Sequence, residues 1–137
     1  MNEPATPQHI LLDTSVLIDY PEVHSALPED AEAAISAISL AELAAGLHST
    51  KDPVRQAQRQ LQFQWVVKSF DPLAFDAETA HVYGSLAFLV EQIGTKPRGR
   101  VADLQIAAAA VQHALPLYTR NPDDFKGLGP LLNVVTV

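Results

Sequence analysis

Short apolar runs alternate along the chain with longer segments whose apolar residues recur at helical spacing. The run at residues 9–12 precedes Asp13-Thr14-Ser15, residue types that favour helix N-caps, and a second short run spans residues 33–38. We interpret each of these runs as a strand that leads into a helix. The pattern predicts two further short strands near the carboxyl end, at residues 116–119 and 133–137.

The longer segments predict helices between these strands. Leu40, Leu43 and Leu47 would share one face of a helix, and the Asp52-Pro53 pair is a favourable start for the next one. Gly94 and Pro116 mark helix exits further along the chain. The predicted helices cover residues 39–47, 52–67, 76–93 and 102–115.

Strands that alternate with helices favour parallel pairing with helices on both faces of the sheet. The predicted fold is therefore α/β, a three-layer α/β/α sandwich with a small, mainly parallel sheet. With 137 residues, of which 47% are apolar, the chain has the usual size of one domain, and we expect a single domain over residues 1–137.

Acidic residues stand just beyond the predicted strands, where α/β folds place their functional crevice. Asp13, Glu42 and the turn at residues 121–124 have this position, and Asp103 begins a helix that is apolar on nearly every side.

Each of these acids also has an explanation that involves no ligand. Asp13 could cap a helix, Ser39-x-x-Glu42 matches a capping box, and a first-turn Asp103 suits the helix dipole. Asp123 and Asp124 could be ordinary turn residues.

Taken together, these acids predict a metal site. Three or four carboxylates at one sheet edge would repel one another unless a cation neutralised them, and hard oxygen ligands suit Mg²⁺, with Mn²⁺ as a substitute. Such a centre can activate water for attack on a phosphodiester. The pattern therefore favours hydrolysis of a nucleic-acid backbone.

The net charge of −7 argues at first against a nucleic-acid partner, because phosphate binding relies on Lys and Arg. However, five basic residues outnumber three acidic ones between Gly94 and Lys126. Basic side chains there could hold phosphates, or they could simply keep a surface loop solvated. The hydroxyls after the first strand could bind a phosphate oxygen, or they could cap the following helix. The candidate residues for binding the nucleic-acid backbone are Thr14, Ser15, Arg98, Arg100 and Arg120.

The chain has no cysteine, no signal-peptide pattern and no apolar run long enough to cross a bilayer. These features suit a soluble protein of a reducing compartment. We expect a cytoplasmic location without a membrane partner.

Four segments, LLDTSVLID, ISLAELAAGL, RGRVADLQIAAAA and LYTRNPDDF, resemble in order the successive motifs of PIN-domain ribonucleases. The likeness is greatest to VapC-type toxins of bacterial toxin–antitoxin pairs and covers essentially the whole chain. It implies an Mg²⁺- or Mn²⁺-dependent endoribonuclease that forms a homodimer and is inhibited by a cognate VapB-type antitoxin. The family's acids match Asp13, Glu42 and Asp103, and the fourth position falls on Asn121 or Asp124.

Two other functions stay open on the sequence. An inert protein-binding domain would use the acids only as helix caps. A phosphatase-like domain would use Asp13 as a nucleophile, although that chemistry favours a second Asp where Ser15 stands. The sequence does not identify the RNA substrate, the number of metal ions, or which of Asn121, Asp123 and Asp124 completes the site.

Overall fold

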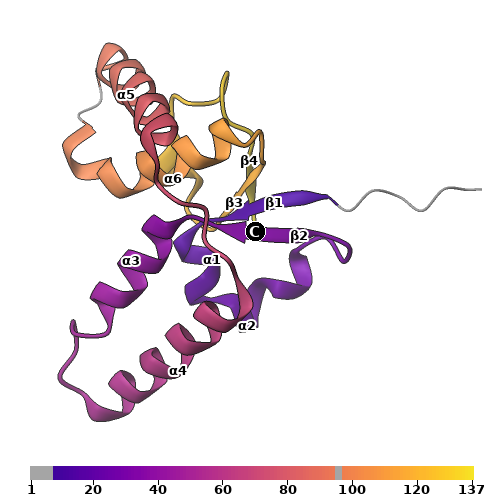
Figure 1. Cartoon of the computed structure of the whole chain (residues 1–137), viewed down its shortest axis with the longest axis vertical. Coiled ribbons are helices and arrows are strands. Elements are labelled where there is room, and N and C mark those ends of the chain that lie inside the picture. Colours follow the sequence, from indigo (N-terminus) through magenta and orange to yellow (C-terminus); the bar gives the residue numbers. More distant parts are fainter. Residues whose placement is uncertain (1–7, 95–96) are drawn as a thin grey trace, which may run out of the picture.

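A parallel four-stranded sheet forms the centre of the molecule in the computed structural model, which describes residues 8–94 and 97–137 (Figure 1). The strand order is β2-β1-β3-β4, and every pair is parallel, as predicted. Leu12 at the end of β1 pairs with Ile35 of β2 on one side and Tyr118 of β3 on the other. The strands are β1 (His9–Leu12), β2 (Glu32–Ile35), β3 (Leu117–Thr119) and β4 (Val134–Thr136).

The α-helices connect the strands and differ from the predicted ranges mainly at their ends. They are α1 (Thr14–Ile18), α2 (Tyr20–Val23), α3 (Ala37–Gly46), α4 (Pro53–Ser69), α5 (Ala77–Gln92) and α6 (Val101–Gln112). The described residues also form three short 3₁₀ helices, η1 (His24–Ala26), η2 (Pro97–Arg100) and η3 (Pro122–Phe125). No helix in the part of the chain that the structure describes is long and apolar enough to cross a membrane.

Helices cover both faces of the sheet because successive strand residues point to opposite sides. Leu11 packs into a core with the apolar residues of α5 and α6, whereas Ile10 and Leu12 pack on the other face with α1, α2 and Val66 of α4. All four of these side chains are fully buried. The three-layer arrangement is therefore confirmed, with α5 and α6 above the sheet and the other helices below it in Figure 1.

The α3–α4 pair forms a hairpin that extends away from the body of the molecule (Figure 1). As predicted, α4 begins after Asp52, whose carboxylate accepts a hydrogen bond of 3.1 Å from the Val54 N–H. The start of α3 differs from the prediction. Its N-cap is Ser36, which accepts from the Ile38 N–H at 3.0 Å, and Ser39 lies fully buried in the first turn. The capping-box explanation of Glu42 is therefore wrong.

The exit from α6 requires a left-handed residue. Ala114 has φ 53°, and the chain reverses there so that the Leu115 N–H bonds the Ala110 carbonyl at 2.9 Å. This reversal, which usually employs glycine, ends the helix three residues before the predicted position and directs the chain into β3.

We predict that Ala114→Gly stabilises the protein. A left-handed conformation costs a non-glycine residue about 1–2 kcal/mol, and glycine removes this cost. Glycine also makes the unfolded chain more flexible, which lowers the stability of the folded protein by about 0.4–1 kcal/mol and offsets part of the gain. The free energy of unfolding in urea should rise by about 0.5–1 kcal/mol. Ala57→Gly, at an exposed position inside α4, is the matched control and should lower it by about 1 kcal/mol. Equal losses for both variants would contradict the argument.

Candidate metal centre

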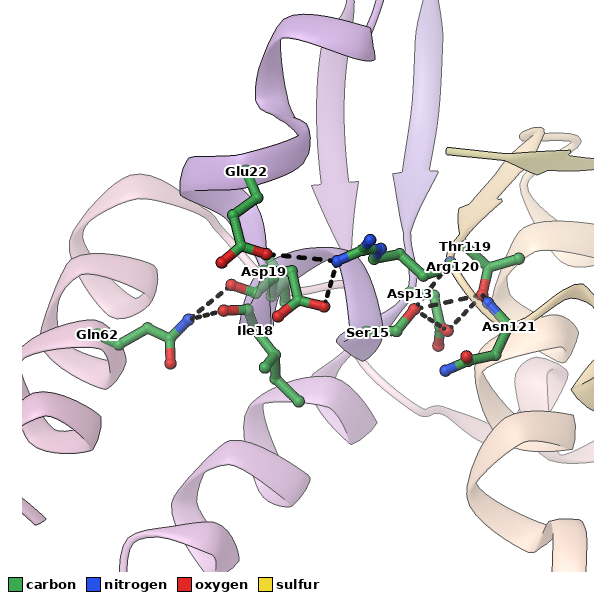
Figure 2. A network of polar contacts seen from close by, with 10 residues as sticks. Asp13, Ser15, Ile18, Asp19, Glu22, Gln62, Thr119, Arg120 and Asn121 are labelled. Carbon is green, nitrogen blue, oxygen red and sulfur yellow. Dashed lines mark hydrogen bonds and ion pairs between the residues drawn. The ribbon is translucent and has the colours of Figure 1, made fainter. Parts of the chain in front are cut away.

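Asp13 is held at the carboxyl edge of the sheet by two hydroxyls. Its Oδ2 accepts hydrogen bonds from Thr119 Oγ1 at 2.7 Å and from Ser15 Oγ at 2.8 Å (Figure 2). Asp13 occupies the N-cap position of α1, yet its side chain bonds no N–H group of that helix. Helix capping therefore does not explain this buried charge, which is only 3% exposed.

The second oxygen of Asp13 is directed differently. Oδ1 makes no hydrogen bond among the described residues. Every fully buried side-chain nitrogen or oxygen in those residues has a hydrogen-bond partner, so Oδ1 cannot be fully buried. Oδ1 is thus the part of this carboxylate that solvent or a ligand can reach.

Glu42 approaches the same edge from the second turn of α3. Its side chain is exposed, and its Oε1 lies 2.7 Å from the Thr14 hydroxyl, which is also 2.8 Å from the buried Ser39 hydroxyl. Because Thr14 has a single hydroxyl proton, it can donate to either the Glu42 carboxylate or the Ser39 hydroxyl at any one time. Residues at the start of α1 therefore orient both Asp13 and Glu42.

Asp103 lies in the first turn of α6 and completes the acidic group. Burial, and after it the charges of Asp124, Asp13 and Glu42 in that order of importance, together raise its pKa from the usual 3.8 to about 6. The Arg100 guanidinium opposes this rise. Four carboxylates from distant parts of the chain therefore share one electrostatic environment.

The chemistry of these donors fits a hard divalent cation, since all four are carboxylates that repel one another. Their present arrangement is more open than a finished coordination shell. Across residues 8–94 and 97–137, no three His, Asp or Glu side chains are close enough to hold one ion. Glu42 is exposed, and Asp103 and Asp124 are partly buried, so each of these three side chains is at least partly open to solvent.

The turn after β3 distinguishes the three candidates for the fourth position. Asp124 is partly buried, and its charge is the strongest acting on Asp103. Asp123 is exposed and pairs with Lys126 at 3.5 Å. Asn121 is exposed, and its backbone N–H donates to Thr119 Oγ1 at 3.0 Å. The electrostatics favour Asp124.

Two of the predicted phosphate-binding arginines have partners within the chain. Arg100 donates from Nε and Nη2 to the Asp124 carbonyl, which ties the start of α6 to η3. Arg120 Nη1 lies 2.6 Å from Asp19 Oδ2 and 3.5 Å from Glu22 Oε2 (Figure 2). The predicted role of the Arg98 side chain lies outside the described residues.

Several residues of this site were not among the predicted ones. Thr119 holds Asp13, Ser39 supports Thr14, and Asp19 and Glu22 hold Arg120. Thr119 had a signal in the sequence, because it is a polar residue at the end of a predicted strand. Nothing local marked the other three.

The site lies between the carboxyl ends of β1 and β3. From β1 the chain continues to β2 on one side of the sheet and then to β3 and β4 on the other, and α/β folds bind their ligands at such a reversal of strand order. A family model described as PIN domain matches residues 10–129. The chain belongs to the PIN-domain family.

The chain is also similar to curated PIN-domain relatives and to a solved structure over most of its length. Ribonuclease VapC of Rickettsia bellii (strain RML369-C) is 35% identical over 77% of both chains. Ribonuclease VapC5 of Mycobacterium tuberculosis (strain ATCC 25618 / H37Rv) is 33% identical over 90% of both. The crystal structure of VapBC-5 from M. tuberculosis, a member of the VapBC family of toxin–antitoxin systems, superposes with a TM-score of 0.79 and 31% identity. It covers 96% of this chain and 98% of that one.

The raised pKa of Asp103 predicts a pH-dependent stability in metal-free buffer. The folded protein binds this proton more tightly than the unfolded chain, so the associated stability is complete below about pH 4 and is lost as the pH rises through 6. Asp103→Asn removes the charge, and we expect it to raise the unfolding temperature at pH 7.5 relative to the unsubstituted protein.

At pH 4 the same substitution should have little effect. Asp123→Asn, in the exposed turn, is the matched control and should show no such pH dependence. Thermal unfolding in EDTA at the two pH values measures both. An equal effect of Asp103→Asn at pH 4 and 7.5 would show that Asp103 has an ordinary pKa in the folded protein.

The hydrogen bond from Thr119 predicts a role in orienting Asp13. Thr119→Val keeps the shape of this fully buried side chain but removes the donor. Because loss of a group that orients a metal ligand typically weakens metal binding about 10–100-fold, we expect that loss for Mn²⁺ in calorimetry. Thr119→Ser, which keeps the hydroxyl, should bind close to normally. Equal affinities for the valine and serine variants would contradict this role.

Proposed function

We propose that this protein is a divalent-metal-dependent endoribonuclease and the toxin of a toxin–antitoxin pair. The observation that carries the proposal is the shared environment of Asp13, Glu42, Asp103 and Asp124 at the strand-order reversal of a PIN domain. The VapC ribonucleases among its relatives and the VapBC toxin–antitoxin structures among its structural neighbours support the same function.

In this proposal Asp13, Glu42 and Asp103 hold the principal Mg²⁺, with Mn²⁺ as a substitute, and Asp124 completes the centre. When bound, the cation would supply Lewis acidity that activates water and stabilises the charge developing on the phosphodiester. The donor chemistry and the raised pKa of Asp103 support the assignment.

Other residues of the chain orient these carboxylates and hold the RNA. Thr119 and Ser15 fix Asp13, Thr14 fixes Glu42, and Arg100 keeps η3 beside α6. Arg120 is anchored at the edge of the site by Asp19, a contact with both side chains 37% exposed. In that position the guanidinium can exchange this exposed ion pair for a phosphate of the RNA backbone.

We further propose that the partner is a VapB-type antitoxin and that the protein is a cytoplasmic homodimer of a single nuclease domain. Exposed apolar side chains line a groove of about 690 Å³ between α2 and α4, among them Ile18, Leu61 and Trp65. Polar side chains such as Glu22, Gln58 and Arg59 also line this groove, and a mixed surface with exposed apolar residues suits a protein partner. The family resemblance supports the dimer.

Replacement of Asp103 tests the function directly. We expect Asp103→Asn to abolish RNA cleavage in Mg²⁺ and to reduce Mn²⁺ uptake in calorimetry, because a carboxylate in the shared environment is lost. The fold should persist, as judged by cooperative thermal unfolding. Cleavage at the normal rate by this variant would contradict the site assignment.

Two comparisons complete this experiment. Asp124→Asn should impair cleavage more than Asn121→Ala, since of these two residues Asp124 is the one whose charge acts on Asp103. An inert binding domain would instead show no Mn²⁺ uptake that depends on Asp13, Glu42 and Asp103. A phosphatase-like enzyme would form a detectable aspartyl-phosphate on Asp13.

A further inference from the structure

A second cavity adjoins the acidic group on the side of the α3–α4 hairpin. It has a volume of about 330 Å³, which is within the range of small-ligand sites. Glu42 belongs to both the acidic group and the wall of this cavity, and Thr14, which bonds Glu42, also lines it. A ligand in the cavity is therefore next to whatever the carboxylates hold.

The cavity wall combines apolar surface with a few polar groups. Ile18, Leu43 and the ring of Phe63 provide the apolar part, and Arg59 and Gln62 of α4 provide polar groups. With one cation, Arg59, and one acid, Glu42, the lining suits a neutral group better than a phosphate. A flat heteroaromatic ring with polar edges matches this combination.

The polar groups of the cavity are fixed in place. Gln62 Nε2 donates to the carbonyls of Leu17 at 2.7 Å and Ile18 at 2.9 Å, so its amide oxygen points away from α1 (Figure 2). Arg59 uses Nη1 to bond the Gly46 carbonyl at 2.8 Å and the Ser49 hydroxyl, which leaves Nε and Nη2 without partners among the described residues. Gln62 and Arg59, which line the cavity, are thus held by hydrogen bonds to α1 and to the end of α3, and they keep an acceptor and two donors without partners among the described residues.

We propose that this cavity binds one unstacked nucleobase of the RNA, in the nucleotide next to the cleaved phosphodiester. The proposal rests on the ribonuclease function proposed above. Single-stranded RNA is recognised through splayed bases that stack on aromatic rings and hydrogen-bond along their edges, and Phe63, Gln62 and Arg59 offer these two kinds of contact. A base and its phosphate are joined through one ribose, which requires the two sites to be adjacent, and they share Glu42.

Gly46 allows the cavity to be filled without altering its polar groups. This residue ends α3, lines the cavity and has no atom within 4 Å of the position that a Cβ would take. Gly46→Leu should therefore fold and place a side chain where the base would lie. Leucine also has a higher helix propensity than glycine. Gly46→Ala is the matched control, because it gives the same helical benefit but leaves most of the cavity open.

The test is cleavage of a randomised single-stranded RNA library in MnCl₂, with sequencing of the cut ends. The unsubstituted protein should show unequal base use at one position beside the cut. Gly46→Leu should flatten that distribution and lower kcat/KM about tenfold to a hundredfold, mainly through KM, which is the range that one stacked base contributes. Its Mn²⁺ affinity should stay unchanged, and Gly46→Ala should keep the normal base use and KM.

Phe63→Leu provides a second variant, since it keeps apolar volume but removes the aromatic face. It should weaken the base preference at the same position. The proposal is overturned if Gly46→Leu cuts with the normal base distribution and KM, or if the unsubstituted protein cuts without any base preference.

The remaining outcomes separate this proposal from the function on which it rests. If the unsubstituted protein cuts no RNA in MnCl₂, the ribonuclease function itself fails, and the base site fails with it. If Gly46→Leu cuts normally but binds the antitoxin more weakly, the cavity takes a protein segment, and the nucleobase assignment is wrong.

Discussion

Parallel pairing of β1 with β3 is the constraint on which the site depends. Leu12 is in register with Tyr118, so the residues that follow them, Asp13 and Thr119, lie side by side at one edge of the sheet. β2 lies on the other side of β1, so the chain leaves this edge in two directions. The result is an opening between β1 and β3 that helices on both faces can reach. Antiparallel pairing would place these residues at opposite ends.

The same constraint concentrates negative charge, which the fold must accommodate. Each acid is stabilised in a different way. Asp13 receives two hydroxyl hydrogen bonds, Glu42 receives one, and Asp103 gains from the amino-terminal end of α6. These contacts do not cancel the repulsion, because burial and the neighbouring carboxylates still raise the pKa of Asp103 to about 6. The unneutralised charge is what makes a divalent cation the fitting ligand of this edge.

The α3–α4 hairpin gives the acidic edge a neighbour of different character. Gln62 bonds the carbonyls at the end of α1, and Arg59 bonds the end of α3, so α4 is connected by polar contacts to both helices that carry or orient Glu42. Glu42 therefore stands between a charged site suited to a phosphodiester and a mixed apolar and polar cavity suited to a base. Glu42 of α3 thus faces Arg59 and Gln62 of α4 across one cavity.

The sequence by itself determined the apolar strands, the helix cap at Asp52 and the order of the acids, because these depend on residues close together in the chain. Only the tertiary structure decided that α3 begins after Ser36 and that Asp124 joins Asp13, Glu42 and Asp103 as the fourth acid of the group. It also decided that Arg100 and Arg120 have partners within the chain. The physical reason is separation. The bond from Thr119 to Asp13 joins residues 106 positions apart, and no local propensity encodes such a contact.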